Sequence, residues 1–359
     1  MNSEIRRDFE VLLKEARKEE MWEPGISAQN SFSAKVRQLL EGHPHKELFE
    51  REIFGFGPLE DFVRDDACTE IILNGPERLY VEKWGKIHEL PAPFLSPWSF
   101  QRFLQKITEE AQIKFDLENP FSSFSWRGFR VHLSHPPLAM PHHLVTLRRV
   151  DRKSPLLLKD LVATESCSFA QAEKLKEGVR RKKNILVVGG TGSGKTTTLS
   201  ALLKELPQEE RLVILEDTDE IPLPNFLSAK LLTREKSPAL AAFDLGDLLK
   251  QALRMRPDRL VVGEVRGGEA KDLLMSLSTG HEGSFATLHA ATPQEALLRL
   301  EMLIQMGAPH WNIHSIQKLI SLTVDWIVVV QKREGLRKIE GVYELTSLES
   351  IGFLTQKIA

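Results

Sequence analysis

The second half of the chain carries short apolar runs that alternate with stretches of helical periodicity. The runs are bounded by turn residues or charges and cover residues 185–188, 212–215, 260–262, 284–288 and 326–330. A continuous apolar run of this length predicts a strand that is buried on both faces, because a half-exposed strand alternates apolar and polar residues. Strands that alternate with helices in this way predict an α/β domain, with a mostly parallel sheet and helices on both faces.

The first half of the chain shows shorter and more polar elements. Apolar residues recur at helical spacing among many charges in residues 4–20, and a second helical stretch covers residues 33–51. We expect the first helix to dock on its own protein. A partner-binding or membrane-surface helix is the alternative, and the interspersed acids disfavour the membrane. The next part predicts a small α+β domain, in which a helical segment at 97–111 lies among strand-like runs at 69–73, 78–83, 129–134 and 144–150.

These patterns divide the chain into four parts. We predict a helical N-terminal arm at residues 1–50, an α+β N-terminal domain at 51–150, a linker at 151–165 and the α/β domain at 166–359. A length of 359 residues fits two domains with an added arm, and 42% hydrophobic residues suffice for a core in each domain.

A glycine-rich segment connects the first apolar run of the second half to a helix-like stretch. It consists of Gly189, Gly190, Thr191, Gly192, Ser193, Gly194, Lys195, Thr196 and Thr197. The glycines let backbone N–H groups turn inward around a phosphate, and the following helix points its positive N-terminus at the same anion. Lys195 is placed to meet the β- and γ-phosphates, and the Thr196 hydroxyl is placed to ligate Mg²⁺. A strand-to-helix connector without a ligand is the alternative, but GxxxxGKT after a buried strand favours a nucleotide site.

Charge and cysteine content argue against several classes of protein. The chain has 48 Lys and Arg against 50 Asp and Glu, a net charge of −2, so no overall basic field recruits nucleic acid or an anionic membrane. Cys68 and Cys167 lie far apart, which indicates neither a disulfide framework nor a zinc site. The first residues lack an apolar signal core, and no stretch approaches the roughly 18 apolar residues of a membrane span. We therefore expect a cytoplasmic location.

Carboxylates follow two of the predicted buried strands, where such folds place their metal and water handling. Glu264 follows the run at 260–262. The acids that follow the run at 212–215 are Glu216, Asp217, Asp219 and Glu220. Surface charge at a strand end is the alternative, which we favour for Asp219, whereas Glu264 is expected to hold Mg²⁺ through water or to orient the attacking water. Gly263 stands where an aspartate is usual, so metal binding is expected to rest more on Thr196 and water.

Two histidines, His281 and His289, flank the strand-like run at 284–288. A lone histidine is usually structural. A pair around one strand, in a chain that already holds a phosphate loop, raises the case for sensing the γ-phosphate. Metal binding is less favoured, because no third Cys or His ligand lies at suitable spacing.

Four segments together resemble the Walker A, Asp box, atypical Walker B and His box of the bacterial type II/IV secretion ATPases. They are GGTGSGKTT at 189–197, LEDTDEI at 215–221, ALRMRPDRLVVGEVRGGEA at 252–270, and the segment from TGH to TLHA at 279–290. The third segment is the most specific. Further segments at 56–59, 70–76 and 145–149 make the chain similar to the Tad (Flp) pilus assembly branch. The resemblance runs from about residue 50 to the end of the chain.

The resemblance implies a RecA-like P-loop ATPase domain that works in a ring, usually a hexamer, with an N-terminal domain that helps to cover ATP. It also implies that the N-terminal domain supplies arginines to the phosphates, and Arg130 and Arg148 occupy the matching positions. A surface salt bridge is the alternative for each arginine. Glu264 matches the Walker B glutamate. Which acid of the Asp box orients water stays open among Glu216, Asp217 and Glu220.

Together these features predict a homo-oligomeric ATPase that hydrolyses Mg-ATP and passes a domain motion to an inner-membrane platform protein of a pilus or secretion system. We expect it to attach to the membrane peripherally, through partners. One alternative is a nucleic-acid-translocating RecA-like motor, which the near-neutral charge and the lack of a basic tract with aromatics disfavour. The other is a nucleotide-gated scaffold without turnover, which the intact Lys195, Thr196 and Glu264 disfavour.

Overall fold

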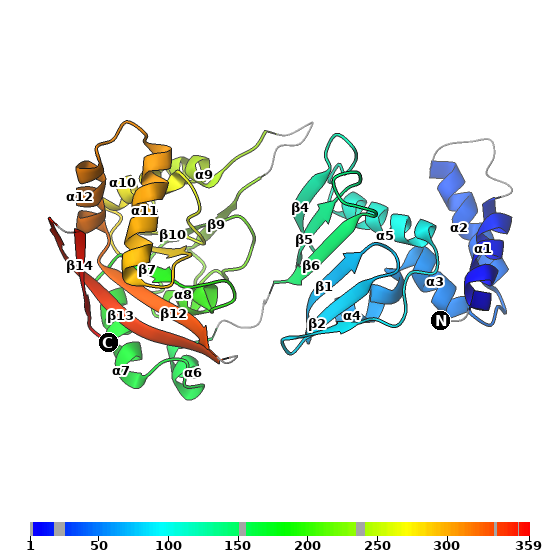
Figure 1. Ribbon diagram of the computed structural model, residues 1–359, viewed down its shortest axis with the longest axis horizontal. Helices are drawn as coiled ribbons and strands as arrows, with labels where there is room; N and C mark the ends of the chain where they lie inside the picture. Colours follow the sequence, from blue (N-terminus) through cyan, green and yellow to red (C-terminus); the bar gives the residue numbers. More distant parts are fainter. Residues whose placement is uncertain (1–2, 18–25, 151–155, 235–240, 334–335, 351) are drawn as a thin grey trace. The chain divides into compact units, whose positions relative to one another are not determined.

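The computed structural model forms two units, Met1–Val150 and Asp151–Ala359 (Figure 1). The residues that it describes are 3–17, 26–150, 156–234, 241–333, 336–350 and 352–359. The division falls at the predicted end of the N-terminal domain. Each unit has hydrophobic clusters of its own and is described by itself.

The N-terminal arm consists of helices α1 (Ser3–Arg17), α2 (Ile26–Leu40) and α3 (Lys46–Phe54). The apolar stripe of α1 includes Phe9 and Leu13, which are buried in one cluster with Leu40, Phe49 and Leu95. An amphipathic helix gains stability by burying such a stripe. The expectation that the first helix docks on its own protein is therefore confirmed.

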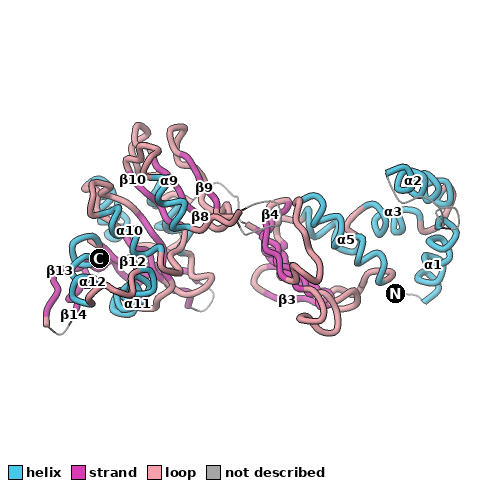
Figure 2. Tube along the Cα trace, turned by 90° about the horizontal axis from the view of Figure 1, so that it is seen from above, coloured by secondary structure: helices cyan, strands magenta, loops and turns pink. Residues whose placement is uncertain are grey.

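The rest of the first unit is an antiparallel sheet with the order β3-β2-β1-β6-β5-β4. Its elements are η1 (Gly57–Leu59), α4 (Glu60–Arg64), β1 (Cys68–Asn74), β2 (Leu79–Lys83), β3 (Lys86–Glu89), α5 (Pro97–Glu110), β4 (Phe121–Trp126), β5 (Phe129–Ser134) and β6 (Leu144–Arg149). One face of the sheet packs on α5, which lies between the sheet and the arm in both views (Figures 1 and 2). Strands β3 and β4 were not predicted, since β3 is exposed throughout and β4 is rich in serine.

The second unit is built on an eight-stranded sheet with the order β14-β13-β12-β7-β11-β10-β8-β9. The six strands from β12 to β9 in this order run parallel to one another. Strand β13 is antiparallel to β12, and β14 is antiparallel to β13. Their bounds are β7 (Ile185–Val188), β8 (Leu212–Glu216), β9 (Ala229–Leu232), β10 (Arg259–Val262), β11 (Phe285–Leu288), β12 (Trp326–Arg333), β13 (Leu336–Glu349) and β14 (Gly352–Lys357). The predicted buried strands are confirmed. Strands β9, β13 and β14 are more polar, and the apolar pattern did not reveal them.

Helices cover both faces of this sheet, as predicted. They are α6 (Leu158–Ala163), α7 (Phe169–Arg180), α8 (Lys195–Leu203), α9 (Leu245–Ala252), α10 (Glu269–Leu277), α11 (Pro293–Gly307) and α12 (Ile313–Thr323). Helices α6 to α8 contribute to one buried cluster and α9 to α12 to the other. Among the described residues, no helix is long and apolar enough to cross a membrane.

The predicted linker at 151–165 needs a correction. Residues 151–155 lie outside the described part of the chain, but α6 occupies most of the remainder. Leu158 and Leu161 are buried in the core of the second unit beside Cys167. Two leucines one turn apart make a short helix with an apolar face, so this segment belongs to the second unit.

Candidate active site

The glycine-rich segment lies between β7 and α8, at the carboxyl end of the parallel strands. Gly192 and Gly194 have φ angles of +68° and +101°, in the left-handed region that favours glycine. A Cβ atom at Gly189 would lie 2.3 Å from the carbonyl oxygen of Val330, so this position also requires glycine. The loop therefore has the backbone of an anion cradle that opens onto a helix N-terminus.

Lys195 begins α8, and its side chain turns back over the loop. The residue is buried, and its Nζ atom donates hydrogen bonds to the carbonyl oxygens of Gly189 and Gly190, each at 3.0 Å. The same Nζ lies 3.5 Å from Nε2 of His289. The predicted phosphate lysine and one of the two predicted histidines thus meet at this edge of the sheet.

Glu264 lies in the same group of side chains. Its Oε1 is 3.0 Å from His289 Nε2, and its Oε2 accepts a hydrogen bond from Arg266 Nε at 2.7 Å. Arg266 also reaches Oδ2 of Asp217 at 3.4 Å, which joins the Walker B and Asp box segments. Because β10 and β11 are parallel to β7 and β8, the residues that follow these strands lie at one edge.

The surroundings of His289 lower the pKa of its imidazole. Burial lowers its pKa from the ordinary value, the charge of Lys195 lowers it further, and Glu264 opposes this shift. Nε2 of a neutral imidazole can accept a hydrogen bond from the Lys195 ammonium. In the other tautomer, the same atom can donate a hydrogen bond to the Glu264 carboxylate. It is therefore able to report a change in charge beside Lys195.

Three buried oxygen atoms at this edge lack a hydrogen bond within the described residues, namely Ser193 Oγ, Glu264 Oε1 and Glu216 Oε2. Of these, Glu216 Oε2 has the cation of Lys230 at 2.9 Å. Glu264 Oε1 is close to His289, but the approach does not meet hydrogen-bond geometry. Buried polar atoms are rarely left in this way unless a ligand or water completes them. Ser193 Oγ, Glu264 Oε1 and the glycine cradle fit a bound Mg-nucleotide.

The described residues contain no group of three or more His, Cys, Asp or Glu side chains that could hold a metal ion. Thr196, the predicted Mg²⁺ ligand, is half-buried at the start of α8 next to Lys195, and Thr197 follows it. A magnesium ion here would rest on the Thr196 hydroxyl, water and phosphate oxygens, which agrees with the ion's preference for oxygen ligands and retained waters.

Glu216 is organised differently, although it also follows a parallel strand. Its Oε1 accepts hydrogen bonds from the backbone N–H groups of Glu220 and Ile221 at 3.2 and 3.0 Å, and its Oε2 lies 2.9 Å from Lys230 Nζ. Burial raises the pKa of Glu216, while Lys230 lowers it. These contacts make Glu216 an anchor for the loop after β8. In that loop, Glu220 is exposed and Asp219 pairs with Lys230.

The structure does not bring His281 to the phosphate loop within one chain. Its Nδ1 lies 3.2 Å from the carbonyl oxygen of Ser276, and the residue precedes β11. The phosphate loop follows β7, which is parallel to β11, so His281 is at the amino edge of the sheet and His289 at the carboxyl edge. The sequence suggested that the two histidines act as a pair. The structure instead places them at opposite edges of the sheet.

Arg130 and Arg148 lie in the first unit, directly opposite each other on β5 and β6. Glu70 of β1 is opposite Arg148 on its other side. Burial raises the pKa of Glu70, Glu82 raises it further, and Arg148 lowers it. Two cations and one partly compensating acid thus form a row across the sheet. Their contact with phosphates in the second unit stays a prediction.

Arg149, the next residue along β6, has a structural environment. Its guanidinium donates to the carbonyl oxygens of Cys68, Phe62, Val63 and Asp65, and it lies 4.3 Å from the ring centroid of Phe129. These contacts close the carboxyl end of α4. Arg149 is therefore occupied, whereas Arg130 and Arg148 stay the phosphate ligands that the sequence predicts.

The structure adds two residues to the site that sequence reasoning did not single out. Arg266 joins Glu264 to Asp217, and Lys230 pairs with Glu216. Arg266 stands two residues after Glu264 in the matched motif, so its position was a usable signal. Lys230 had no comparable signal, because it comes from β9, a strand without an apolar pattern.

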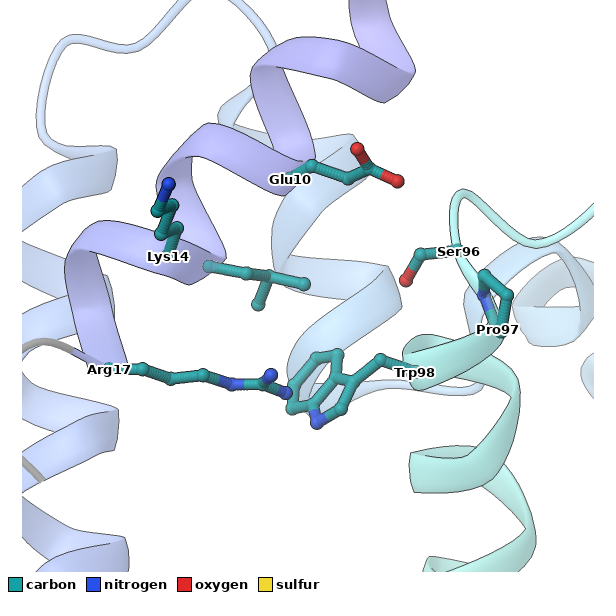
Figure 3. Close-up of a pocket in the computed structure, with 7 residues that line it drawn as sticks. Glu10, Lys14, Arg17, Ser96, Pro97 and Trp98 are labelled. Carbon is teal, nitrogen blue, oxygen red and sulfur yellow. The ribbon is translucent and has the colours of Figure 1, made fainter. Parts of the chain in front are cut away.

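A separate cavity of about 460 Å³ lies in the first unit, between α1 and the start of α5 (Figure 3). Leu13, Pro97 and Trp98 line it, and the Arg17 guanidinium carbon lies 5.0 Å from the centroid of the Trp98 ring. Charged side chains (Glu10, Lys14 and Arg17) line the cavity together with the apolar ones, and it lacks the glycine loop and the paired acids of the second unit. We therefore assign the chemistry to the phosphate-loop edge.

Comparisons with known proteins show the family of this chain. The family model described as "Type II/IV secretion system protein" matches residues 52–332, which include the phosphate loop, Glu264 and His289. A putative conjugal transfer protein of Mycobacterium tuberculosis is 32% identical over 84% of this chain and 88% of its own length. Conjugal transfer protein TrbB of Rhizobium radiobacter is 32% identical over 84% of this chain and 93% of its own length.

A solved structure has a similar fold. The pilus retraction motor PilT with bound ADP is 23% identical, with a TM-score of 0.56 over 83% of this chain and 80% of that chain. At this identity the likeness concerns the fold, a mixed α/β arrangement with two sheets, and not the activity.

Proposed function

This chain belongs to the type II/IV secretion ATPase family, and on that premise we propose that it is the ATP-hydrolysing motor of a secretion or pilus assembly system. The motor would consist of RecA-like domains in a homo-oligomeric ring, a hexamer by the family resemblance, and would drive an inner-membrane platform protein from the cytoplasmic side. The observation that carries the proposal is the meeting of Lys195, His289 and Glu264 at the phosphate loop.

We assign each group a role at the site. Lys195 and the loop N–H groups would bind the phosphates, and the Thr196 hydroxyl would hold Mg²⁺. When bound, the ion would neutralise negative charge on the phosphates. Glu264 has one oxygen on Arg266 and the other beside His289, so its carboxylate is fixed in direction and able to orient a water. His289 links this carboxylate to Lys195.

Arg130 and Arg148 would complete the site when an N-terminal domain closes over the nucleotide. An arginine that neutralises transition-state charge raises the rate by roughly 10³–10⁵. Catalytic groups that come from another domain or subunit would link turnover to closure and assembly. Within one chain, His281 lies at the opposite edge of the sheet from the phosphate loop. We therefore propose no catalytic step for His281 at that loop.

The setting is a choice between pilus assembly and a type IV or conjugal transfer apparatus. The sequence resembles the Tad pilus branch, while the relatives named above are conjugal transfer proteins. Gene neighbourhood distinguishes the two. Prepilin, prepilin peptidase and secretin genes would place the motor in a pilus system, and conjugation genes would place it in a transfer system.

Phosphate release from Mg-ATP by the purified protein tests the proposal. We expect turnover that single-stranded DNA or RNA does not stimulate, and light scattering should show assembly promoted by a non-hydrolysable ATP analogue. Binding without phosphate release would support the scaffold alternative. Strong stimulation by nucleic acid would support the nucleic-acid motor, and a monomer under all nucleotide conditions would contradict the ring.

A further inference from the structure

The hairpin of β12 and β13 borders the phosphate loop along one side. Strand β12 is parallel to β7, with Val329 opposite Val188, so it lies beside the strand that leads into the loop. Val330 of β12 continues this contact, because its carbonyl oxygen is 2.3 Å from where a Cβ of Gly189 would be. The loop thus packs directly on the hairpin, without room for side chains between them.

Arg337 of β13 reaches the loop itself. Its Nε donates a hydrogen bond to the carbonyl oxygen of Gly192 at 3.1 Å. Its Cδ atom lies 3.3 Å from where a Cβ of Gly194 would be, so the stem of the side chain crosses over the second left-handed glycine. The residue is exposed, and it lies outside the segment 52–332 that matches the family model.

The hydrogen bond from Arg337 fixes the direction of the peptide group between Gly192 and Ser193. The C=O of Gly192 and the N–H of Ser193 belong to the same planar trans peptide and point in opposite directions. When the carbonyl is held outward by Arg337, the Ser193 N–H is turned across the loop, and it donates to the carbonyl oxygen of Gly190 at 3.3 Å. Gly192, on one side of this peptide, is in the left-handed region and has no Cβ, so the peptide is less restrained by its neighbours unless something holds it.

We propose that Arg337 is a positioning residue for the nucleotide. It holds the Gly192–Ser193 peptide, and with it the turn that the Ser193 N–H closes on Gly190, so that the loop keeps its shape for phosphate, and its guanidinium adds positive charge beside an anion site. The C-terminal hairpin thereby contributes to the affinity for a nucleoside di- or triphosphate. This inference rests on the proposed function, since it concerns the same site.

Removing the Arg337 side chain should weaken nucleotide binding and leave the rate of hydrolysis at saturating ATP nearly unchanged. ADP and Mg-ATP both use the loop, so Arg337→Ala should weaken ADP binding about tenfold and raise KM for ATP by a similar factor. The kcat at saturating ATP should stay within about threefold, because Arg337 contacts the loop and not the catalytic groups. Arg337→Lys keeps a donor and a charge and should restore part of the affinity.

Arg333→Ala is the matched control. Arg333 lies on the same hairpin and is also exposed, but its Nε contacts Gln331 and Glu340 within the hairpin. This variant should bind ADP as the wild type does. Titration calorimetry with ADP, beside melting curves of all variants without nucleotide, makes the comparison.

The outcomes separate clearly. Wild-type affinity in Arg337→Ala, or an equal loss in Arg333→Ala, would overturn the role of Arg337 and leave the ATPase proposal standing. A melting temperature that falls in Arg337→Ala and Arg337→Lys without nucleotide would show a fold role and also overturn it. A wild-type protein that binds neither ADP nor ATP would overturn both proposals.

Discussion

The ends of β8 and β10 present the same sequence pattern and different chemistry. Each is a buried parallel strand with a glutamate either as its last residue or two residues beyond it, and the two strands are neighbours, with Val262 opposite Leu215. At the end of β8, Glu216 Oε1 accepts hydrogen bonds from two backbone N–H groups of its own loop, and Oε2 lies 2.9 Å from Lys230 Nζ. After β10, Glu264 accepts a hydrogen bond from the Arg266 side chain, and its Oε1 faces His289 beside Lys195. A carboxylate bound by the backbone of its own loop holds that loop, whereas one held by side chains next to the phosphate loop is available to a substrate.

Lys195 and Lys230 should differ in the same way as the two glutamates. The substitution of Lys195 has the largest expected effect. Lys195→Ala should lower turnover by about 10³ or more and greatly weaken ATP binding, because it removes a ground-state phosphate contact. Lys230→Ala, the matched control at the other end, should keep turnover within about tenfold and lose about 2–4 kcal/mol of stability, because Glu216 is left buried without its cation. Phosphate release and denaturant unfolding measure both. Equal kinetic losses in the two variants would erase the distinction between the strand ends.

The adjacent arginines of β6 extend the comparison to the first unit. Arg148 is exposed, while Arg149 is enclosed by backbone carbonyls and Phe129. Arg148→Ala should therefore lower kcat by about 10² or more with little change in melting temperature. Arg149→Ala should instead destabilise the protein by about 2–4 kcal/mol, since several buried carbonyl groups lose their donor. A kcat within a few-fold of wild type in Arg148→Ala would show that it is no finger and move the role to Arg130.

Glu216 itself offers a smaller and cleaner test. Glu216→Gln keeps the shape and removes the charge, so Lys230 loses its buried counter-ion and stability should fall by about 1–3 kcal/mol. The turnover number should change by less than tenfold, because Glu216 binds the loop after β8 and not the phosphate loop. Steady-state kinetics beside a melting curve would reveal the opposite result, a stable protein with no turnover, which would return Glu216 to the catalytic acids.

The sequence predicted the parts of this molecule that local patterns encode. The buried parallel strands, the phosphate loop and Glu264 followed from apolar runs and motif spacing, because both are set by a few neighbouring residues. The role of Glu216 could not be predicted, since its partner Lys230 comes from β9, which lacks an apolar pattern. Arg148 and Arg149 look alike in sequence, and only the carbonyl groups around Arg149 distinguish them. The histidines could have been separated, because a residue that follows a strand parallel to β7 lies on the phosphate-loop side.

The smallest expected effect is on the stability of the folded protein at acidic pH. The pKa of His289 is lowered from 6.5, first by burial and then by Lys195. Below pH 6.5 the unfolded chain takes up a proton that the folded protein still resists, so stability falls as the pH drops toward the lowered pKa. His289→Gln removes this contribution. Melting curves at pH 7.5 and 5.5 should show a smaller acid-induced loss in the variant, by less than about 1 kcal/mol. An identical loss in both proteins would contradict the environment assigned to His289.

The central claim is that the end of β10 is the catalytic centre of an ATPase, and Glu264→Gln tests it most directly. The measurement is binding of a fluorescent ATP analogue and phosphate release on the same preparation. The substitution keeps the size of the side chain and its contact with Arg266 but removes the carboxylate, so we expect binding within about threefold of wild type and turnover lower by about 10² or more. Wild-type turnover by Glu264→Gln would contradict the claim.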